Sequence, residues 1–390
     1  MGFQFKTLSL SVLATAALVA CGGGGGDAAV APAPTAVAQG VTATLAALGN
    51  PPAVTATNTT STAYDLVAAI GDTWRVNFDS TGNAYTVTIL QSQYGLSGTS
   101  AGTSGTFTKT TSGNYTTYSL GTVGTLIVDD RTKAVSGNMT IGAKASTVAG
   151  TGYAAPALNK LAGTYNFAYH TRNASDGGSP DMGAGQFTVS PDGASIAICP
   201  GGTINAAATA CTPQLPGSPS VPLAGTSAVA PNGLITLTVT ENNVTAEFGK
   251  LHVHVGDRGP ILLIDRYGRN AQNVMRTGAF YAAKAVAAAG TEFDGHWACN
   301  KTGGISGSTA VVSGTSATIT DPAPSNLVST ANLYYNQVYN RGTQQTLSLP
   351  GFLSIGSSLA TSDIVLTLSS SLAVAQTGNG TDLSVCHRTN

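Results

Sequence analysis

The segment Asp72-Thr-Trp-Arg-Val-Asn-Phe-Asp-Ser-Thr-Gly-Asn-Ala-Tyr-Thr-Val-Thr-Ile89 decides the fold class, because apolar and polar residues alternate on both sides of a polar turn. The large apolar side chains fall on one face of each half: Trp74, Val76, Phe78, Tyr85, Val87 and Ile89. A period of two is typical of half-buried strands, and Asp79–Asn83 has the composition of a turn. The segment therefore predicts a β-hairpin.

The same alternation continues along the chain. Tyr165, Phe167 and Tyr169 share one face of a strand, and residues 234–264 predict a meander of short strands interrupted by Asn and Gly. Ala279–Ala289 predicts a short Ala-rich helix that ends at Gly290. We predict an all-β fold of two or three small antiparallel barrel or sandwich modules in tandem, with at most one short helix.

The composition agrees with strands and turns. Only 9% of the 390 residues are charged, and 48 residues are glycine. The 17 basic and 18 acidic residues nearly cancel, which argues against a nucleic-acid-binding protein, since such a protein carries a basic face.

The amino terminus has the features of a secretory signal. Lys6 precedes an uncharged apolar stretch from Leu8 to Val19, which is too short to span a membrane. The sequence Leu18-Val19-Ala20-Cys21 resembles the lipobox of bacterial lipoproteins. This resemblance implies cleavage before Cys21, a diacylglycerol on its thiol and an acylated amino group. Gly22 in place of Asp after Cys21 implies release to the outer membrane, facing either the outside or the periplasm.

These features divide the chain into five segments. Residues 1–20 are the predicted signal peptide, and residues 21–62, rich in Gly, Ala, Pro and Thr, are the predicted lipidated flexible tether. Three β modules are expected at residues 63–155, 156–290 and 291–390.

Four cysteines remain besides Cys21. Each predicted pair lies within one module, Cys199 with Cys211 and Cys299 with Cys386. No pair has the C-x-x-C spacing of many metal sites, so structural disulfides of an oxidising compartment are favoured over metal binding.

Three glycine-aromatic segments open runs of predicted strands: Gly71-Asp-Thr-Trp74, Gly163-Thr-Tyr165 and Gly295-His-Trp297. They resemble the first strand of lipocalin- and avidin-type barrels, in which a tryptophan after glycine closes one end. Gly278-Ala-Phe-Tyr-Ala-Ala-Lys-Ala285 is similar to a segment of transferrin-binding-type surface lipoproteins, with Ala282-Ala283 in place of Gly-Pro. Both resemblances imply small antiparallel barrels.

Gly124–Arg131 and Gly259–Arg266 share the order glycine, apolar strand, Asp-Arg. Either the two segments are diverged copies of one meander, or the order recurs by chance in a chain of low complexity. We expect each Asp-Arg to be a pair in a turn at the end of its strand.

Two groups of side chains are candidates for binding. His252 and His254 share one face of a predicted strand and, with His170, have the donor types of a zinc or copper site; the alternative is a polar solvent face. Tyr334, Tyr335 and Tyr339 lie among asparagines and are suited to stacking on sugars; the alternative is that they fill a sheet face.

We predict no nucleophile elbow of the Gly-x-Ser-x-Gly type, and the sequence contains no His-Glu-x-x-His, phosphate-loop or dinucleotide motif. We therefore expect a non-enzymatic protein with no cofactor other than the lipid on Cys21. Two functions remain open: binding of a glycan, protein or other ligand at the envelope, and a structural role in outer-membrane assembly without a small ligand. The partner and the oligomeric state do not follow from the sequence.

Overall fold

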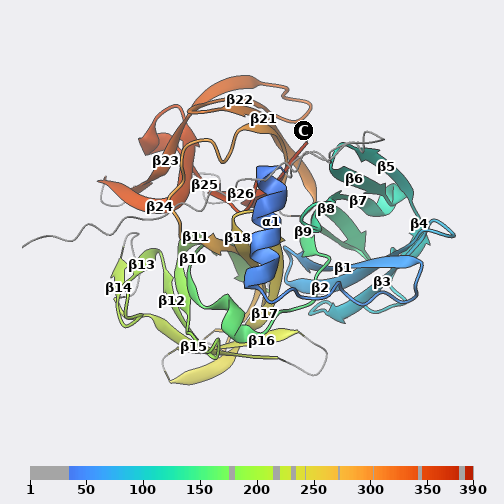
Figure 1. Cartoon of the computed structure of the whole chain (residues 1–390), viewed down its shortest axis with the longest axis horizontal. Coiled ribbons are helices and arrows are strands. Elements are labelled where there is room, and N and C mark those ends of the chain that lie inside the picture. Colours follow the sequence, from blue (N-terminus) through green and yellow to red (C-terminus); the bar gives the residue numbers. More distant parts are fainter. Residues whose placement is uncertain are drawn as a thin grey trace, which may run out of the picture. The chain divides into compact units, whose positions relative to one another are not determined.

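Antiparallel strands make up nearly all of the regular structure in the computed structural model (Figure 1). The structure describes residues 35–174, 181–213, 220–229, 234–241, 243–270, 273–301, 303–340, 345–376 and 383–389. Their strands form one nine-stranded sheet, two closed eight-stranded barrels and one two-stranded sheet. The predicted all-β fold of tandem small antiparallel modules is confirmed.

The first sheet has the strand order β4-β3-β2-β1-β9-β8-β7-β6-β5. Its strands are β1 (Ser61–Ala68), β2 (Asp72–Asp79), β3 (Ala84–Gln91), β4 (Ser104–Thr106), β5 (Thr108–Ser112), β6 (Tyr115–Ser119), β7 (Gly124–Asp129), β8 (Ala134–Ile141) and β9 (Lys144–Thr151). The predicted hairpin is confirmed as β2 and β3, because Val76 lies opposite Val87 and Phe78 lies opposite Tyr85.

The two edges of this sheet are joined by a single residue, Phe107, which lies between β4 and β5. Phe107 is buried, and its ring centroid lies 5.1 Å from that of Phe78 and 5.4 Å from that of Tyr118. Because consecutive residues must lie close together, the sheet curls until its edges meet at this side chain. The first module is therefore a nearly closed barrel.

The second barrel follows the order β10-β11-β12-β15-β16-β17-β18-β19 and closes where β19 pairs with β10. Its strands are β10 (Gly163–Asn173), β11 (Asp181–Val189), β12 (Ser195–Pro200), β15 (Leu223–Val229), β16 (Ile235–Glu241), β17 (Val244–Gly256), β18 (Gly259–Arg269) and β19 (Met275–Lys284). A separate hairpin, β13 (Gly202–Ile204) with β14 (Cys211–Pro213), lies between β12 and β15 in the chain.

One α-helix, α1 (Ala36–Ala47), precedes the strands. Thr35 caps it by accepting a hydrogen bond from the Ala38 amide at 3.3 Å. Val41 of α1 and Leu48, which follows it, are buried in the core of the second barrel. The predicted flexible tether is therefore wrong for this part of residues 21–62, because apolar residues among the alanines give the helix a barrel core to pack against.

The predicted helix over Ala279–Ala289 is also wrong, since β19 occupies Met275–Lys284. Phe280 and Ala282 face the barrel core, whereas Ala279, Tyr281 and Ala283 belong to a second buried cluster outside it. A strand buried on both faces loses the alternation of apolar and polar residues that identifies strands in sequence.

The third barrel follows the order β20-β21-β22-β23-β24-β25-β26-β27 and closes where β27 pairs with β20. Its strands are β20 (Gly295–Lys301), β21 (Ile305–Ser313), β22 (Ser316–Thr320), β23 (Val328–Asn340), β24 (Gln345–Gly356), β25 (Asp363–Thr367), β26 (Leu372–Gln376) and β27 (Leu383–Arg388). Trp297 in β20 is buried and donates to the Phe293 carbonyl at 2.8 Å. Tyr165 in β10 donates to the Leu161 carbonyl at the same distance, 2.8 Å, so the two glycine-aromatic openings share one local geometry.

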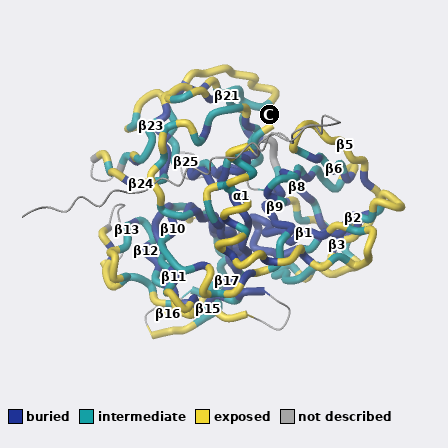
Figure 2. Tube along the Cα trace, viewed as in Figure 1, coloured by how far each residue is buried: buried dark blue, intermediate teal, exposed yellow. Residues whose placement is uncertain are grey.

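Outward-facing side chains of the three modules form a shared apolar cluster, which includes Val67, Ala149, Ile261, Leu263, Tyr281, Phe352, Leu366, Val374 and Val385. Figure 2 shows the buried parts of β1, β9 and β17 in dark blue. Residues from Thr35 onward accordingly form one compact unit. The outer faces of several barrel strands are thus buried against a neighbouring module.

Candidate functional site

A cavity lies at one end of the second barrel, at the level of Arg266. The register places Gly249, Arg266, Gly278 and Thr171 directly opposite one another across β17, β18, β19 and β10. Arg266 lies two residues beyond Ile264, which faces the core, so its side chain also projects into the barrel. At Gly249 and Gly278 the neighbouring backbone is so close that an added Cβ would lie 2.0 Å from a carbonyl oxygen, that of Asp265 or His170.

A layer of aromatic rings lies below this level. Tyr169 and Phe280 stack with ring centroids 4.7 Å apart, and Phe248 meets Phe280 edge to face at 5.1 Å. The Arg266 guanidinium lies 4.3 Å from the centroid of the Phe248 ring and donates to the Phe248 carbonyl at 2.6 Å. The rings and the guanidinium therefore form one wall with apolar faces and a cationic edge.

Arg276, on β19, completes the rim. Its guanidinium donates to the Thr171 hydroxyl at 2.6 Å and to the Asn173 side-chain oxygen at 2.9 Å, and it forms an ion pair with Asp181 at 3.3 Å. Tyr169 donates to the other carboxylate oxygen of Asp181 at 3.3 Å. Burial raises the pKa of Tyr169, so its hydroxyl keeps its proton at neutral pH.

We call this end the mouth and define it by Tyr169, Thr171, Phe248, Arg266, Arg276 and Phe280. It encloses a cavity of about 240 Å³. The barrel core below it is packed with apolar side chains, and Leu161, Val41 and Leu48 belong to the same core cluster. The mouth is thus a shallow pocket with an aromatic floor and hydrogen-bond donors at its rim.

The predicted histidine cluster does not form. His252 and His254 project outward from β17, but they are 5% and 0% exposed, because the first module covers this face. Burial lowers the pKa of His252 to about 4 and lowers that of His254 well below its usual value. The alternative of a polar solvent face is therefore wrong as well.

His170 is buried on β10, which is separated from β17 by β18 and β19. Among the described residues, no group of three His, Cys, Asp or Glu side chains is placed to hold a metal ion.

The covered face also contains a buried carboxyl group. Asp265 is 0% exposed and accepts a hydrogen bond from the Thr73 hydroxyl of the first module. Burial raises the pKa of Asp265 well above its usual value, and the nearby Asp72 carboxyl raises it further. The predicted turn pair is wrong here, because β18 continues to Arg269 and sends Asp265 to the outer face and Arg266 into the mouth.

We expect Asp265→Asn to change how stability depends on pH. The pKa of Asp265 is raised in the folded protein, whereas in the unfolded chain it is about 4. At a pH above about 4, the Asp265 carboxylate therefore takes up a proton when the protein folds. The free energy of unfolding of the native protein should therefore decrease relative to that of the variant as the pH rises above about 4. Urea unfolding of both proteins at several pH values above about 4 measures the difference in the free energy of unfolding. The buried histidines change stability with pH in the opposite direction, but they are present in both proteins, so their effect cancels in this difference. A difference that stays constant with pH would contradict a protonated Asp265.

The three tyrosines do not share one surface. Tyr335 packs against the core of the third barrel and donates to the Gly314 carbonyl at 3.2 Å. Tyr334 precedes it on the opposite face of β23, and an irregularity in the β23–β24 register separates both from Tyr339. The chain therefore does not form the predicted stacking patch from these residues.

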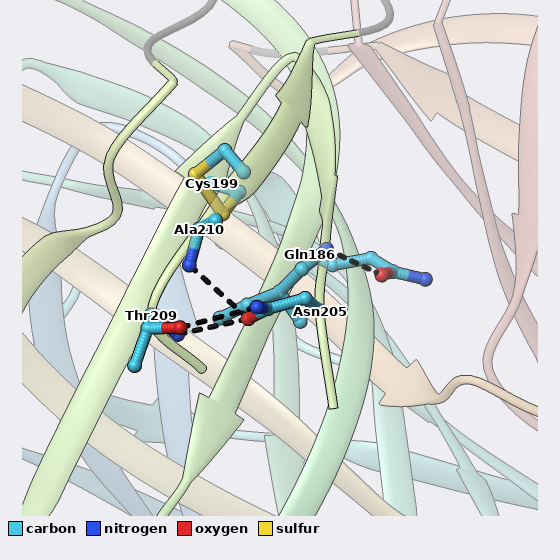
Figure 3. The surroundings of a disulfide bond; sticks show 7 residues. Gln186, Cys199, Asn205, Thr209 and Ala210 are labelled. Atoms are coloured by element: carbon cyan, nitrogen blue, oxygen red, sulfur yellow. Dashed lines mark hydrogen bonds between the residues drawn. A yellow bond between two sulfur atoms is a disulfide. The ribbon is translucent and has the colours of Figure 1, made fainter. Parts of the chain in front are cut away.

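The structure contains both predicted cysteine pairs, Cys199–Cys211 and Cys299–Cys386. The first ties the β13–β14 hairpin to β12. In the loop of that hairpin, Asn205 accepts hydrogen bonds from the amides of Thr209 and Ala210 (Figure 3). The second lies directly across the closing seam between β20 and β27. Cys21 lies outside the described residues.

One segment of the sequence does have the residue pattern of a nucleophile elbow, Gly-x-Ser-x-Gly: it is Gly98-Thr-Ser-Ala-Gly102. Ser100 lies in the loop between β3 and β4, and its hydroxyl accepts from the Ser97 amide at 3.0 Å. A nucleophile elbow requires a strand, a sharp turn and a helix. This segment leads from strand to strand and lacks that context.

Comparison of the chain with protein-family models and with curated proteins gives no match. In the part of the chain that the structure describes, no helix is both long and apolar enough to cross a membrane.

Proposed function

We propose that this protein is a lipid-anchored, non-catalytic binding protein of the bacterial outer membrane that captures a small amphipathic ligand in the mouth of the second barrel. The lipobox-like segment ending at Cys21 supports the anchor. The mouth supports the ligand class, because its rings offer apolar faces and its arginines donate to oxygen atoms.

One observation carries the proposal: two arginines project inward above an aromatic layer in a barrel that is packed with apolar side chains below them. A barrel core gains stability from apolar side chains, and burying a guanidinium there carries a desolvation cost. Two inward arginines at successive levels of one barrel end, Arg266 opposite Gly278 and Arg276 opposite Gly268, are therefore better explained by recognition than by packing.

We expect the protein to bind anilinonaphthalene sulfonate, a fluorescent aromatic anion, saturably in the mouth. Arg266→Met should weaken this binding roughly 10- to 100-fold, because a hydrogen bond to a charged group contributes about 1.5–3 kcal/mol. Arg276→Met tests the rim independently. Arg269→Met is the matched control, since Arg269 is an exposed arginine at the end of the same strand as Arg266.

Fluorescence titration measures the affinities, and circular dichroism checks that each variant is folded. Equal binding by all three variants would exclude the mouth as the site. The absence of saturable binding to this probe and to a panel of glycans and amphipathic molecules would overturn the proposal and favour a structural role in the envelope.

Protease digestion of intact cells tests the orientation. Digestion of the β modules while a periplasmic control protein survives would place the mouth outside the cell. Protection until the outer membrane is opened would place it in the periplasm.

A further inference from the structure

A second cavity, of about 340 Å³, lies between the second and third barrels, away from the mouth. Its walls come from the β17–β18 turn, the end of β19, the linker after it, and strands β24 and β25. The residues that carry its polar groups are Arg258, Lys284, Glu292 and Thr367. Its volume falls within the range of about 300–1,000 Å³ that is usual for small-molecule pockets.

Lys284, the last residue of β19, is one of the residues that line this cavity. Its ammonium group donates to the Ala162 carbonyl at 2.6 Å and lies 4.2 Å from the centroid of the Tyr165 ring. Burial lowers the pKa of Lys284 to about 8. Within the described ranges it forms no ion pair, so an ammonium with three donors keeps capacity for an anion.

Arg258, in the β17–β18 turn, brings a second positive charge. Its closest hydrogen-bond partners are neutral and distant: the Thr367 hydroxyl at 3.5 Å and the Glu292 backbone carbonyl at 3.4 Å. The salt bridges of the described residues do not include Arg258. A guanidinium has five N–H donors in a planar fork that matches carboxylate and phosphate groups.

The neighbouring carboxylates are directed elsewhere. The Glu292 carboxylate accepts from the backbone amides of Ala289, Gly290 and Thr291, the last two at 2.8 and 3.1 Å. Asp257 accepts from the Ser370 amide at 2.8 Å. Both acidic groups therefore stabilise loops. Burial lowers the pKa of Arg258, and the two acidic groups act on it through space and raise its pKa against this effect, but neither forms an ion pair with Arg258 or Lys284 in the described part of the chain.

We propose that the cavity between the barrels binds a small organic oxyanion, with its charged group between Lys284 and Arg258 and its apolar part against Pro260, Val286 and Leu368. Two cationic residues that line one cavity and form no ion pair among the described residues gain electrostatic energy when an oxyanion enters. A carboxylate and a phosphate monoester share this chemistry. Because the walls belong to both barrels, the bound anion also strengthens the contact between them.

Isothermal titration of the full-length, detergent-solubilised protein with butyrate and with butyl phosphate tests the proposal. Butyramide, which has the same size as butyrate but no charge, serves as the neutral probe. We expect both anions, or one of them, to bind saturably and to raise the melting temperature, and we expect butyramide to do neither. Which anion binds more tightly distinguishes a carboxylate ligand from a phosphate ligand.

Lys284→Met and Arg258→Met should each weaken anion binding at least about tenfold, a loss of about 1.4 kcal/mol, whereas Lys284→Arg should retain binding. Lys144→Met is the matched control, because Lys144 lies 4.3 Å from the Tyr94 ring centroid on the first module. Arg266→Met, in the mouth, separates the two sites: loss of butyrate binding in this variant but not in Lys284→Met or Arg258→Met would place the anion in the mouth and overturn the proposal.

Binding of butyramide as tight as that of butyrate would overturn the proposal. So would anion affinity unchanged in both folded variants, Lys284→Met and Arg258→Met, or failure of both anions to bind the native protein.

Discussion

Replacing Cys299 and Cys386 together with serine is expected to lower the free energy of unfolding by about 4.5 kcal/mol. The two residues lie opposite each other in the first and last strands of the third barrel, 87 positions apart in sequence. A cross-link over so long a loop removes many conformations from the unfolded chain. Urea unfolding of the oxidised native protein and the double variant measures the difference.

The second disulfide supplies the control. Cys199 and Cys211 are only 12 positions apart, and the loop-closure model gives about 3 kcal/mol for a loop of this length. The Cys199→Ser, Cys211→Ser variant should therefore lose less stability and keep amide protection in β20 and β27. An equal or larger loss of stability on removing Cys199–Cys211 would contradict the prediction that Cys299–Cys386 stabilises the protein more.

The β2–β3 hairpin followed from the sequence because it needs only local information. Alternation places Val76 and Phe78 on one face, and the residues of Asp79–Asn83 favour a turn. The cysteine pairs also followed from position alone, since each joins strands of one module. These features do not depend on how the modules pack.

The errors share one physical cause: a sequence pattern distinguishes the two faces of a strand but not what covers each face. His252, His254 and Asp265 are polar and face outward, so a solvent face was the simple expectation, yet the first module covers them. The alanines of β19 are apolar on both sides for the same reason. Tyr334 and Tyr335 are consecutive residues of β23 and therefore point to opposite faces, and the face that Tyr335 shares is covered by the core of the third barrel.

The mouth could not have been found by local reasoning. Arg266 and Arg276 meet there because β18 and β19 pair as neighbours and Gly249 and Gly278 fall opposite Arg266. The sequence feature that could point to the mouth is the Asp265-Arg266 pair after an apolar strand. Whether Arg266 lies in a turn or faces the barrel interior depends on where β18 ends, which the sequence alone does not show. In both candidate sites the functional groups come from strands or turns brought together by barrel closure.

Gly278→Ala is expected to destabilise the protein by at least about 3 kcal/mol, the sum of backbone strain and overpacking. Gly278 has φ +144°, which side chains rarely permit. An added Cβ would lie 2.0 Å from the His170 carbonyl oxygen, across the seam where β19 pairs with β10. Chemical unfolding measures the loss, and probe binding should fall as well, because Gly278 lies opposite Arg266.

Gly290→Ala separates the two causes. Gly290 also has a positive φ, +108°, but an added Cβ would meet no atom within 4 Å. This control carries the backbone strain, about 1–3 kcal/mol, without the overlap. A greater loss of stability in Gly278→Ala than in Gly290→Ala would therefore measure the overlap of the added Cβ with the backbone of β10. Equal losses in the two variants would mean that the seam relaxes by a small strand shift, in which case closure of the second barrel does not require glycine at this position.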